Sequence, residues 1–223
     1  MKNIKYIILL LSGIIVTSCA TVVPLNKEFY NTKKVGVILQ IDSIRMAKSG
    51  SQGLLDMALT PGNRFTEPLK KVEPKLNINE IIKNEITYIL NKRNKQFEYL
   101  TEKIDFKSLN NFEKPNSKKK YSKKDYRHLK KTNDVDEILL VNVNYGILVS
   151  YYGVIETGKN GYVNIRSQII DLSDNSLLQN DNVMTTSKII GNWKEGEDYS
   201  NLKNSNEEAI TNSTILLKTK FLN

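Results

Sequence analysis

Cysteine and histidine are the side chains that most often carry nucleophilic or metal chemistry, and this chain of 223 residues has one of each, Cys19 and His128. A zinc site takes about four ligands, so a Cys/His zinc site is excluded. A serine hydrolase would need His128 as its base, yet this residue lies in the run YRHLKK, whose cations disfavour its protonation. The sequence also lacks a nucleophile elbow, a phosphate-binding loop and a dinucleotide-binding fingerprint. We therefore expect no metal and no cofactor, and interpret His128 as a solvated side chain.

Acidic residues are the remaining candidates for catalysis, because glycoside hydrolysis uses a pair of carboxyl groups. Three groups are present: Asp134, Asp136 and Glu137; Asp171 and Asp174; Glu195, Glu197 and Asp198. Each group also has a structural explanation, namely a helix-to-strand junction, a hairpin turn and a solvated loop around Trp193. Trp193 itself is either a binding aromatic or a loop side chain packed on the domain. A carboxylate-dependent envelope hydrolase acting on cell-wall or glycan substrates is therefore the alternative function.

Most of the positive charge lies in one segment. The chain has net charge +9, and residues 114–131, here called the basic segment, hold nine Lys or Arg against the single Asp125, which makes a local charge of +8. Such a segment can bind nucleic acid, anionic lipid headgroups or cell-wall polymers, or it can be a solvated insertion. The candidate polyanion-binding residues are Lys118, Lys119, Lys120, Lys123, Lys124, Arg127, Lys130 and Lys131.

The N-terminus has the features of a secretion signal. Lys2 and Lys5 precede an apolar run over 6–16, which is shorter than the roughly 20 residues that span a bilayer. Val16, Thr17, Ser18 and Cys19 then resemble the bacterial lipobox, although the usual first residue is leucine. The resemblance implies that residues 1–18 are a signal peptide and that an acylated Cys19 anchors the protein to a membrane. Ala20 resembles the residue found in lipoproteins sent to the outer membrane. Nucleic acid is then not an expected partner.

The remaining sequence predicts a tether over 19–33 and one domain over 34–223 with the basic segment as an insertion. Residues 33–41 predict a buried strand, and 42–74 a long connection with one short helix in QGLLDMAL. A helix beginning at Asn77, with Glu80 at capping-box spacing, carries an apolar face of Ile78, Ile81, Ile82, Ile86, Ile89, Leu90 and Phe97. The basic segment then predicts a mobile excursion outside the core, with a short helical turn near 126–130.

The last third of the chain predicts an antiparallel meander. A strand over 136–153 and a second strand are joined by a tight turn at Asn160 and Gly161. The turn at 173–175 leads to a third strand, and a final helix begins at Ser205 and presents Ile210, Leu217 and Phe221 on one stripe. The predicted fold class is α/β (α+β), a mixed sheet with a three-stranded antiparallel meander and helices packed on it.

KKVGVILQI, the amphipathic helix, DVDEILLVNVNY and QIIDLSDNSLLQ are similar to periplasmic α/β lipoproteins, a group that includes the penicillin-binding-protein activators and the curli secretion lipoprotein. In that group a strand ending in aspartate runs into a turn, as at Asp171. The resemblance covers about half of the mature chain. Members of that group act by binding partner proteins or by assembling, so the resemblance implies a non-enzymatic role with an envelope protein as a candidate partner. We therefore expect a membrane-anchored binding or assembly module of the cell envelope.

Overall fold

The protein is a mixed α/β sheet with helices packed on it, as predicted. The computed structural model describes residues 22–31, 33–101, 108–196 and 198–222. Six strands form one sheet in the order β3-β1-β4-β5-β6, and β2 pairs with β4 beyond β1. The elements are η2 (Lys27–Tyr30), β1 (Val35–Ile41), β2 (Arg45–Ser51), α2 (Leu54–Leu59), η3 (Asn63–Phe65), α3 (Thr66–Val72), η4 (Glu73–Lys75), α4 (Ile78–Lys92), β3 (Phe97–Tyr99), α5 (His128–Asn133), β4 (Glu137–Tyr152), β5 (Ile155–Asp171), β6 (Leu177–Lys188) and α6 (Ser200–Leu222).

Strands β4, β5 and β6 form the predicted antiparallel meander. Its first turn is at Gly153, which has φ 57°, and the prediction of a turn at Asn160 and Gly161 is wrong. Asn160 lies inside the ladder, opposite Leu148. Gly161 serves the packing of α6 instead, because a Cβ there would lie 2.6 Å from Ser205 Oγ, and its N–H donates to that oxygen at 2.7 Å.

Strand β2 lies in the connection that was predicted to contain only one short helix. It continues along β4 where β1 stops, so the parallel register passes from Ile41 opposite Val143 to Arg45 opposite Gly146. Gly146 has φ 137°, and a Cβ there would lie 2.1 Å from the carbonyl oxygen of Arg45. Only glycine fits this join between the two strands. The connection also holds the short helices α2 and α3.

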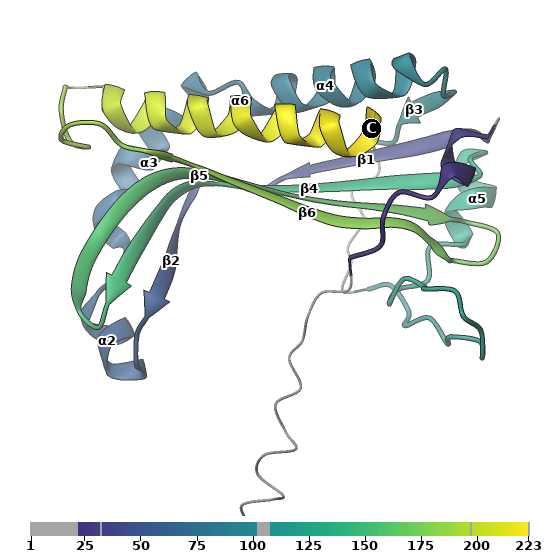
Figure 1. The fold of residues 1–223 in the computed structure, drawn as a ribbon, viewed down its shortest axis with the longest axis horizontal. Coiled ribbons are helices and arrows are strands. Elements are labelled where there is room, and N and C mark those ends of the chain that lie inside the picture. Colours follow the sequence, from purple (N-terminus) through teal and green to yellow (C-terminus); the bar gives the residue numbers. More distant parts are fainter. Residues whose placement is uncertain (1–21, 32, 102–107, 197, 223) are drawn as a thin grey trace, which may run out of the picture.

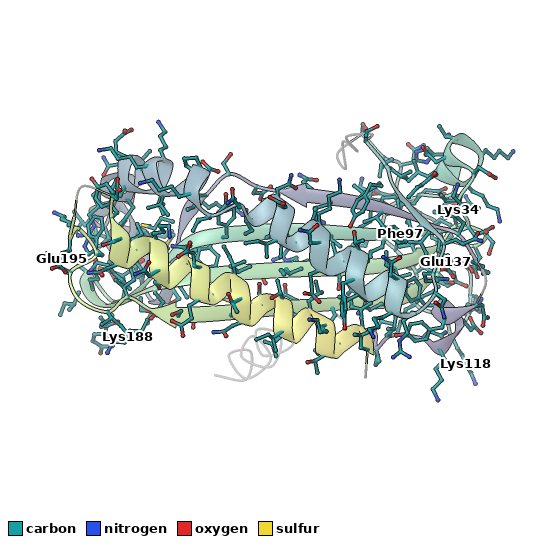
Figure 2. The ribbon with its side chains drawn as sticks, turned by 90° about the horizontal axis from the view of Figure 1, so that it is seen from above. Lys34, Phe97, Lys118, Glu137, Lys188 and Glu195 are labelled. Carbon is teal, nitrogen blue, oxygen red and sulfur yellow. The ribbon has the colours of Figure 1, made fainter. Side chains whose placement is uncertain are left out.

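Helices α4 and α6 cover one face of the sheet (Figures 1 and 2). The predicted stripes are confirmed, except that Ile81 is partly exposed and Phe97 belongs to β3. The buried apolar residues of the two helices are Ile78, Ile82, Ile86, Ile89, Leu90, Leu202, Ala209, Ile210, Leu217 and Phe221. Neither predicted capping box forms. Asn77 has a left-handed backbone conformation, with φ 46°, and its side chain makes no capping hydrogen bond, while Ser205 lies inside α6 and not at its start.

A second, smaller core lies at one end of the sheet and includes part of the basic segment. Its buried residues are Ile38, Tyr126, Leu129, Val135, Ile138, Leu140, Ile170 and Leu172. Tyr126 and Leu129 are 3% and 1% exposed. The prediction that the basic segment lies outside the core is therefore wrong for this part. No helix in the described part of the chain is long and apolar enough to cross a membrane.

Candidate functional site

The basic segment and the first described residues lie next to each other along the free edge of β6. Val23 exchanges two backbone hydrogen bonds with Asn180, at 2.8 and 2.9 Å, and Asn26 N–H donates to Leu178 O at 2.8 Å. Directly beyond them, Leu177 N–H donates to Lys120 O at 2.8 Å. One edge of the sheet therefore holds both residues 23–26 and the segment with most of the positive charge.

Residues 23–30 belong to the folded domain, so the predicted tether over 19–33 is shortened. Phe29 is fully buried in the main core, and the Tyr30 hydroxyl donates to the carbonyl oxygen of Phe221 at the end of α6. Cys19 and the predicted signal peptide over 1–18 lie outside the described residues.

A buried ion pair fastens the N-terminal segment to the sheet. Lys95 Nζ donates to Asn31 O at 2.9 Å, to Lys33 O at 3.1 Å and to Glu137 Oε2 at 2.9 Å. The Lys95 and Glu137 side chains are 1% and 0% exposed. All three ammonium hydrogens thus have acceptors, whereas Glu137 Oε1 has no hydrogen-bond partner among the described residues. Lys95 was not singled out from the sequence, where it is one lysine among many.

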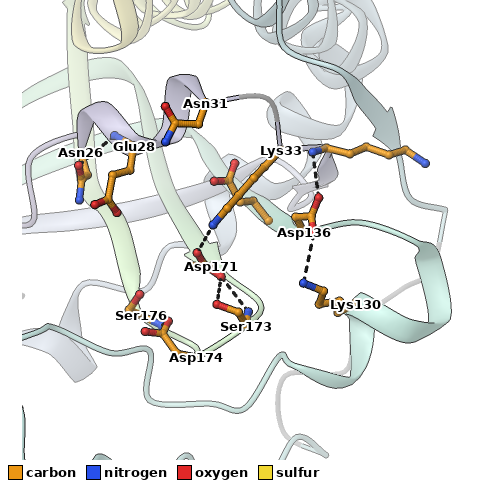
Figure 3. Close-up of polar contacts among 12 residues, drawn as sticks. Asn26, Glu28, Asn31, Lys33, Lys130, Asp136, Asp171, Ser173, Asp174 and Ser176 are labelled. Carbon is orange, nitrogen blue, oxygen red and sulfur yellow. Dashed lines mark hydrogen bonds and ion pairs between the residues drawn. The ribbon is translucent and has the colours of Figure 1, made fainter.

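Two other predicted carboxylates, Asp136 and Asp171, make ion pairs in the same region; they are shown in Figure 3. Lys33 Nζ lies 2.5 Å from Asp171 Oδ2, and Asp136 binds Lys130 Nζ at 3.1 Å. Burial alone would raise the pKa of Asp171, but hydrogen bonds from Lys33 and Ser173 outweigh burial and leave it lowered. The hydrogen bond from Lys130 lowers the pKa of Asp136.

Glu137 differs from these neighbours, because burial raises its pKa to about 7 even though the Lys95 ammonium favours the charged form. A raised carboxyl pKa near a lowered one is the pattern of catalytic acid–base pairs. A general acid must contact its substrate, however, and the Glu137 side chain is fully buried under the N-terminal segment. The arrangement of Glu137 and Asp171 therefore holds that segment in place and does not form a catalytic cleft.

The other predicted carboxylates do not join this group. Asp174 caps the β5–β6 turn and pairs with Lys119 at 2.8 Å, and Asp134 is an exposed left-handed residue after α5. Asp198 pairs with Lys75 at 2.8 Å. Glu195 lies at the opposite end of the molecule from Glu137 (Figure 2), and Glu197 lies outside the described residues. In the part of the chain that the structure describes, none of the predicted carboxylates lines the hollow around Asn142 and Arg166 or the hollow around Glu73 and Tyr145.

The cations of the basic segment divide into two sets. Four have partners: Lys119 with Asp174, Lys124 with the carbonyl oxygen of Leu109, Arg127 with Asp125, and Lys130 with Asp136. The other five side chains are exposed and have no ion pair with a described residue: Lys114, Lys118, Lys120, Lys123 and Lys131. His128 is exposed at the start of α5, and Trp193 packs on Phe65 with ring centroids 4.8 Å apart.

The sheet face opposite the helices is polar over its centre. Asn142 of β4 lies between Gln40 of β1 and Arg166 of β5, and Asn182 of β6 continues this row. The face lines a hollow of about 800 Å³ that also includes Arg45, Lys48, Asn144, Asn164 and Gln168. The alternation of Asn142 and Asn144 with buried valines was visible in the sequence, but it was interpreted only as a strand pattern.

The chain matches no family model, and no curated protein matches it. Among solved structures, a hypothetical protein of Chlamydia trachomatis, CT253, is 7% identical with a TM-score of 0.35, covering 85% of this chain and 98% of that one. The lipoprotein GNA1162 of Neisseria meningitidis is 10% identical with a TM-score of 0.33, covering 80% and 99%. The PelC dodecamer of Paraburkholderia phytofirmans is 12% identical with a TM-score of 0.29, covering 86% and 93%. Likenesses at these scores assign no family, so a proposal about function depends on the residues of this chain.

Proposed function

We propose that this protein is a lipid-anchored lipoprotein of the bacterial cell envelope that acts as a non-enzymatic binding module. The observation that carries the proposal is the lipobox at Val16 to Cys19, with Ala20 favouring the outer membrane. Val23, which is bound to β6, lies four positions after Cys19, with three residues between them. Four residue-to-residue steps span at most about 14 Å. An acylated Cys19 would therefore hold the edge of β6, and the basic segment beside it, close to the membrane surface.

The basic segment is the proposed binding surface, and its ligands are anionic lipid headgroups or other polyanions of the envelope. Lys118, Lys120 and Lys123 suit this role because their side chains are exposed and have no ion-pair partner among the described residues. Lys124 adds charge from a fixed position, since it is held by a carbonyl oxygen, whereas carboxylate partners offset the charges of Lys119, Arg127 and Lys130.

The Cys19→Ser variant tests the anchor. Because the thiol is the group that would be acylated, metabolic labelling with palmitate should be lost in this variant. Ser18→Ala is the matched control, since it keeps a small residue before the cysteine and should be labelled as strongly as the wild type. Equal labelling of Cys19→Ser and wild type would show that the lipobox interpretation is wrong.

Replacing Lys118, Lys120 and Lys123 by Gln tests the basic segment in the chain of residues 19–223 carrying Cys19→Ser. Binding to vesicles of phosphatidylcholine and phosphatidylglycerol should weaken on the order of 10- to 100-fold, because each lysine near an anionic surface contributes about 1 kcal/mol. Wild-type binding should also weaken as salt rises, since screening shortens the Debye length to about 8 Å at physiological ionic strength. Vesicle co-sedimentation measures both effects.

The control for this triple variant replaces Lys70, Lys188 and Lys194 by Gln, which removes the same charge elsewhere. Lys188 lies at the opposite end of the molecule from Lys118 (Figure 2). An equal loss of binding in both triple variants would mean that net charge alone attracts the protein to the vesicle. Both variants should keep the wild-type melting temperature, because all six side chains are exposed.

A further inference from the structure

The far end of the molecule carries a cluster of exposed apolar side chains, here called the apolar tip. It consists of α2 and the turn between β4 and β5. Leu54 and Leu55 are 90% and 72% exposed. The other large apolar side chains of the apolar tip are Met57, Leu59, Tyr152, Val154 and Ile155, each at least half exposed. Monomeric soluble proteins rarely leave a large contiguous apolar patch uncovered, and such a patch marks an interaction site.

Polar contacts hold α2 in place while its apolar side chains remain outside. Lys48 Nζ donates to the carbonyl oxygens of Met57 and Thr60, and Gln52 Nε2 donates to Gly153 O at 3.0 Å in the β4–β5 turn. Asp56 accepts the N–H of Gly53 at 2.9 Å, which caps the helix. No residue of α2 is buried. The helix therefore packs through its backbone and its polar groups, and its leucines do not contribute to the core.

The apolar tip lies on the same side of the sheet as the basic segment. In Figure 1, α4 and α6 lie above the sheet, whereas α2, the curved ends of β2, β4 and β5, and the part of the basic segment before α5 lie below it. The first described residues also approach the β6 edge from below. The polar face of the sheet lies between the apolar tip and the basic segment, and its hollow is lined by Arg45, Lys48 and Arg166 against Asp42 as its one acidic residue.

From this arrangement we infer that the apolar tip inserts into the lipid bilayer and forms a second attachment point beside the acyl anchor. The inference rests on the proposed anchoring at Cys19. The chain between Cys19 and Val23 spans at most about 14 Å, so an acylated Cys19 brings the lower side of the domain to the membrane. The apolar tip projects from that side. Leucine and methionine then enter the boundary between headgroups and acyl chains, while the cations of the polar face meet the headgroups.

Because the acyl chains already hold the protein at the membrane, weak insertion of the apolar tip is sufficient to attach the domain at a second point. A tethered group binds its second site at the effective concentration that the tether sets, which is in the millimolar range for short linkers. The few exposed side chains of the apolar tip would bind a membrane only transiently if the domain were free in solution. With the chain anchored at residue 19, they hold the long axis of the domain along the bilayer.

Tryptophan fluorescence tests the insertion in the chain of residues 19–223, whose single thiol, Cys19, is coupled to a maleimide lipid in phosphatidylcholine vesicles. Trp193→Phe removes the natural tryptophan, and Leu55→Trp places the only one at the apolar tip. The Leu55→Trp emission should shift to shorter wavelength and should be quenched several-fold by brominated acyl chains. Ile190→Trp is the matched control, because Ile190 is 79% exposed but lies in the connection between β6 and α6. It should show neither change.

Replacing Leu54, Met57 and Ile155 by Ser in the Leu55→Trp chain should remove at least half of the quenching. Absence of quenching at residue 55, or equal quenching at 55 and 190, would overturn the inference. A wavelength shift that grows with the number of chains per vesicle and occurs without quenching would show that a second copy covers the apolar tip, which also overturns it. Since the thiol coupling supplies the anchor, failure here is distinct from failure of the acylation proposal, which palmitate labelling decides.

Discussion

At pH 8, where Glu137 is charged, Lys95→Met should destabilise the protein by about 3–5 kcal/mol, the usual cost of removing one partner of a buried ion pair. The variant leaves the Glu137 carboxylate buried without its cation, and it leaves the carbonyl oxygens of Asn31 and Lys33 without their donor. Methionine fills the space of the lysine stem, so loss of packing is not the main cause. Urea unfolding followed by circular dichroism measures the loss of free energy of unfolding.

The effect of Lys95→Met should depend on pH with a definite sign. Burial raises the pKa of Glu137 to about 7 in the folded protein, above its ordinary value of 4.5. The protonated Glu137 carboxyl group is therefore more favourable in the folded state than in the unfolded state. Its contribution to the free energy of unfolding is fully present below about pH 4.5 and is lost as the pH rises through 7. In Lys95→Met, the charged form of the buried Glu137 carboxyl group costs more free energy in the folded state than it does in the wild type. The destabilisation should therefore be larger at pH 8 than at pH 5.

Two further variants control this experiment. Lys34→Met removes a partner of Glu98 at 3.1 Å whose side chain is 32% exposed, and it should cost less than about 1 kcal/mol. Adding Glu137→Gln to Lys95→Met should recover part of the lost stability at pH 8, because it removes the buried charge. If Lys95→Met were as mild as Lys34→Met, the buried pair would not fasten the N-terminal segment.

Ile82→Asp should strongly destabilise the protein. Ile82 is fully buried on the face of α4 that packs on the sheet. The substitution removes a large apolar side chain from the core and buries a carboxylate without a partner, a combination that costs on the order of 4 kcal/mol or more. Thermal melting followed by circular dichroism should show a large fall in the melting temperature or no cooperative transition.

The neighbouring residue provides the control. Ile81→Asp introduces the same side chain one position earlier in α4, where 38% of the isoleucine is exposed. The carboxylate can there reach water, so the loss of stability should stay near 1 kcal/mol. Similar melting curves for the two variants would contradict the orientation of α4 on the sheet.

Elements with a periodic apolar pattern were predictable because that pattern is local. β1, α4, the three strands of the meander and the stripe of α6 all carry it, and all are present. β2 could not be predicted, because RMAKSGS has no strand pattern and forms a strand only through pairing with the end of β4. Asn160 and Gly161 matched a turn, but the ladder of β4 and β5 continues through them and turns at Gly153.

The candidate site was less predictable than the fold. The sequence predicted the charge of the basic segment, but not that Tyr126 and Leu129 tie it to the sheet. It also did not pair Lys95 with Glu137, which lies 42 residues further along the chain. A lysine in a polar loop has the same local sequence whether it is solvated or buried, so burial is known only when the surrounding elements are in place.

By itself, the sequence determined the class of the fold and the position of the main helices and strands, since each depends on residues close together in the chain. The resemblance of Val16 to Cys19 to a lipobox is local in the same way and stays a prediction. Tertiary structure alone decided that the N-terminal segment and the basic segment share the edge of β6. It also decided that the apolar tip lies on the same side of the sheet as the basic segment. These relations join segments far apart in sequence. They arise from strand pairing and from the bend of the sheet, which local sequence patterns do not encode.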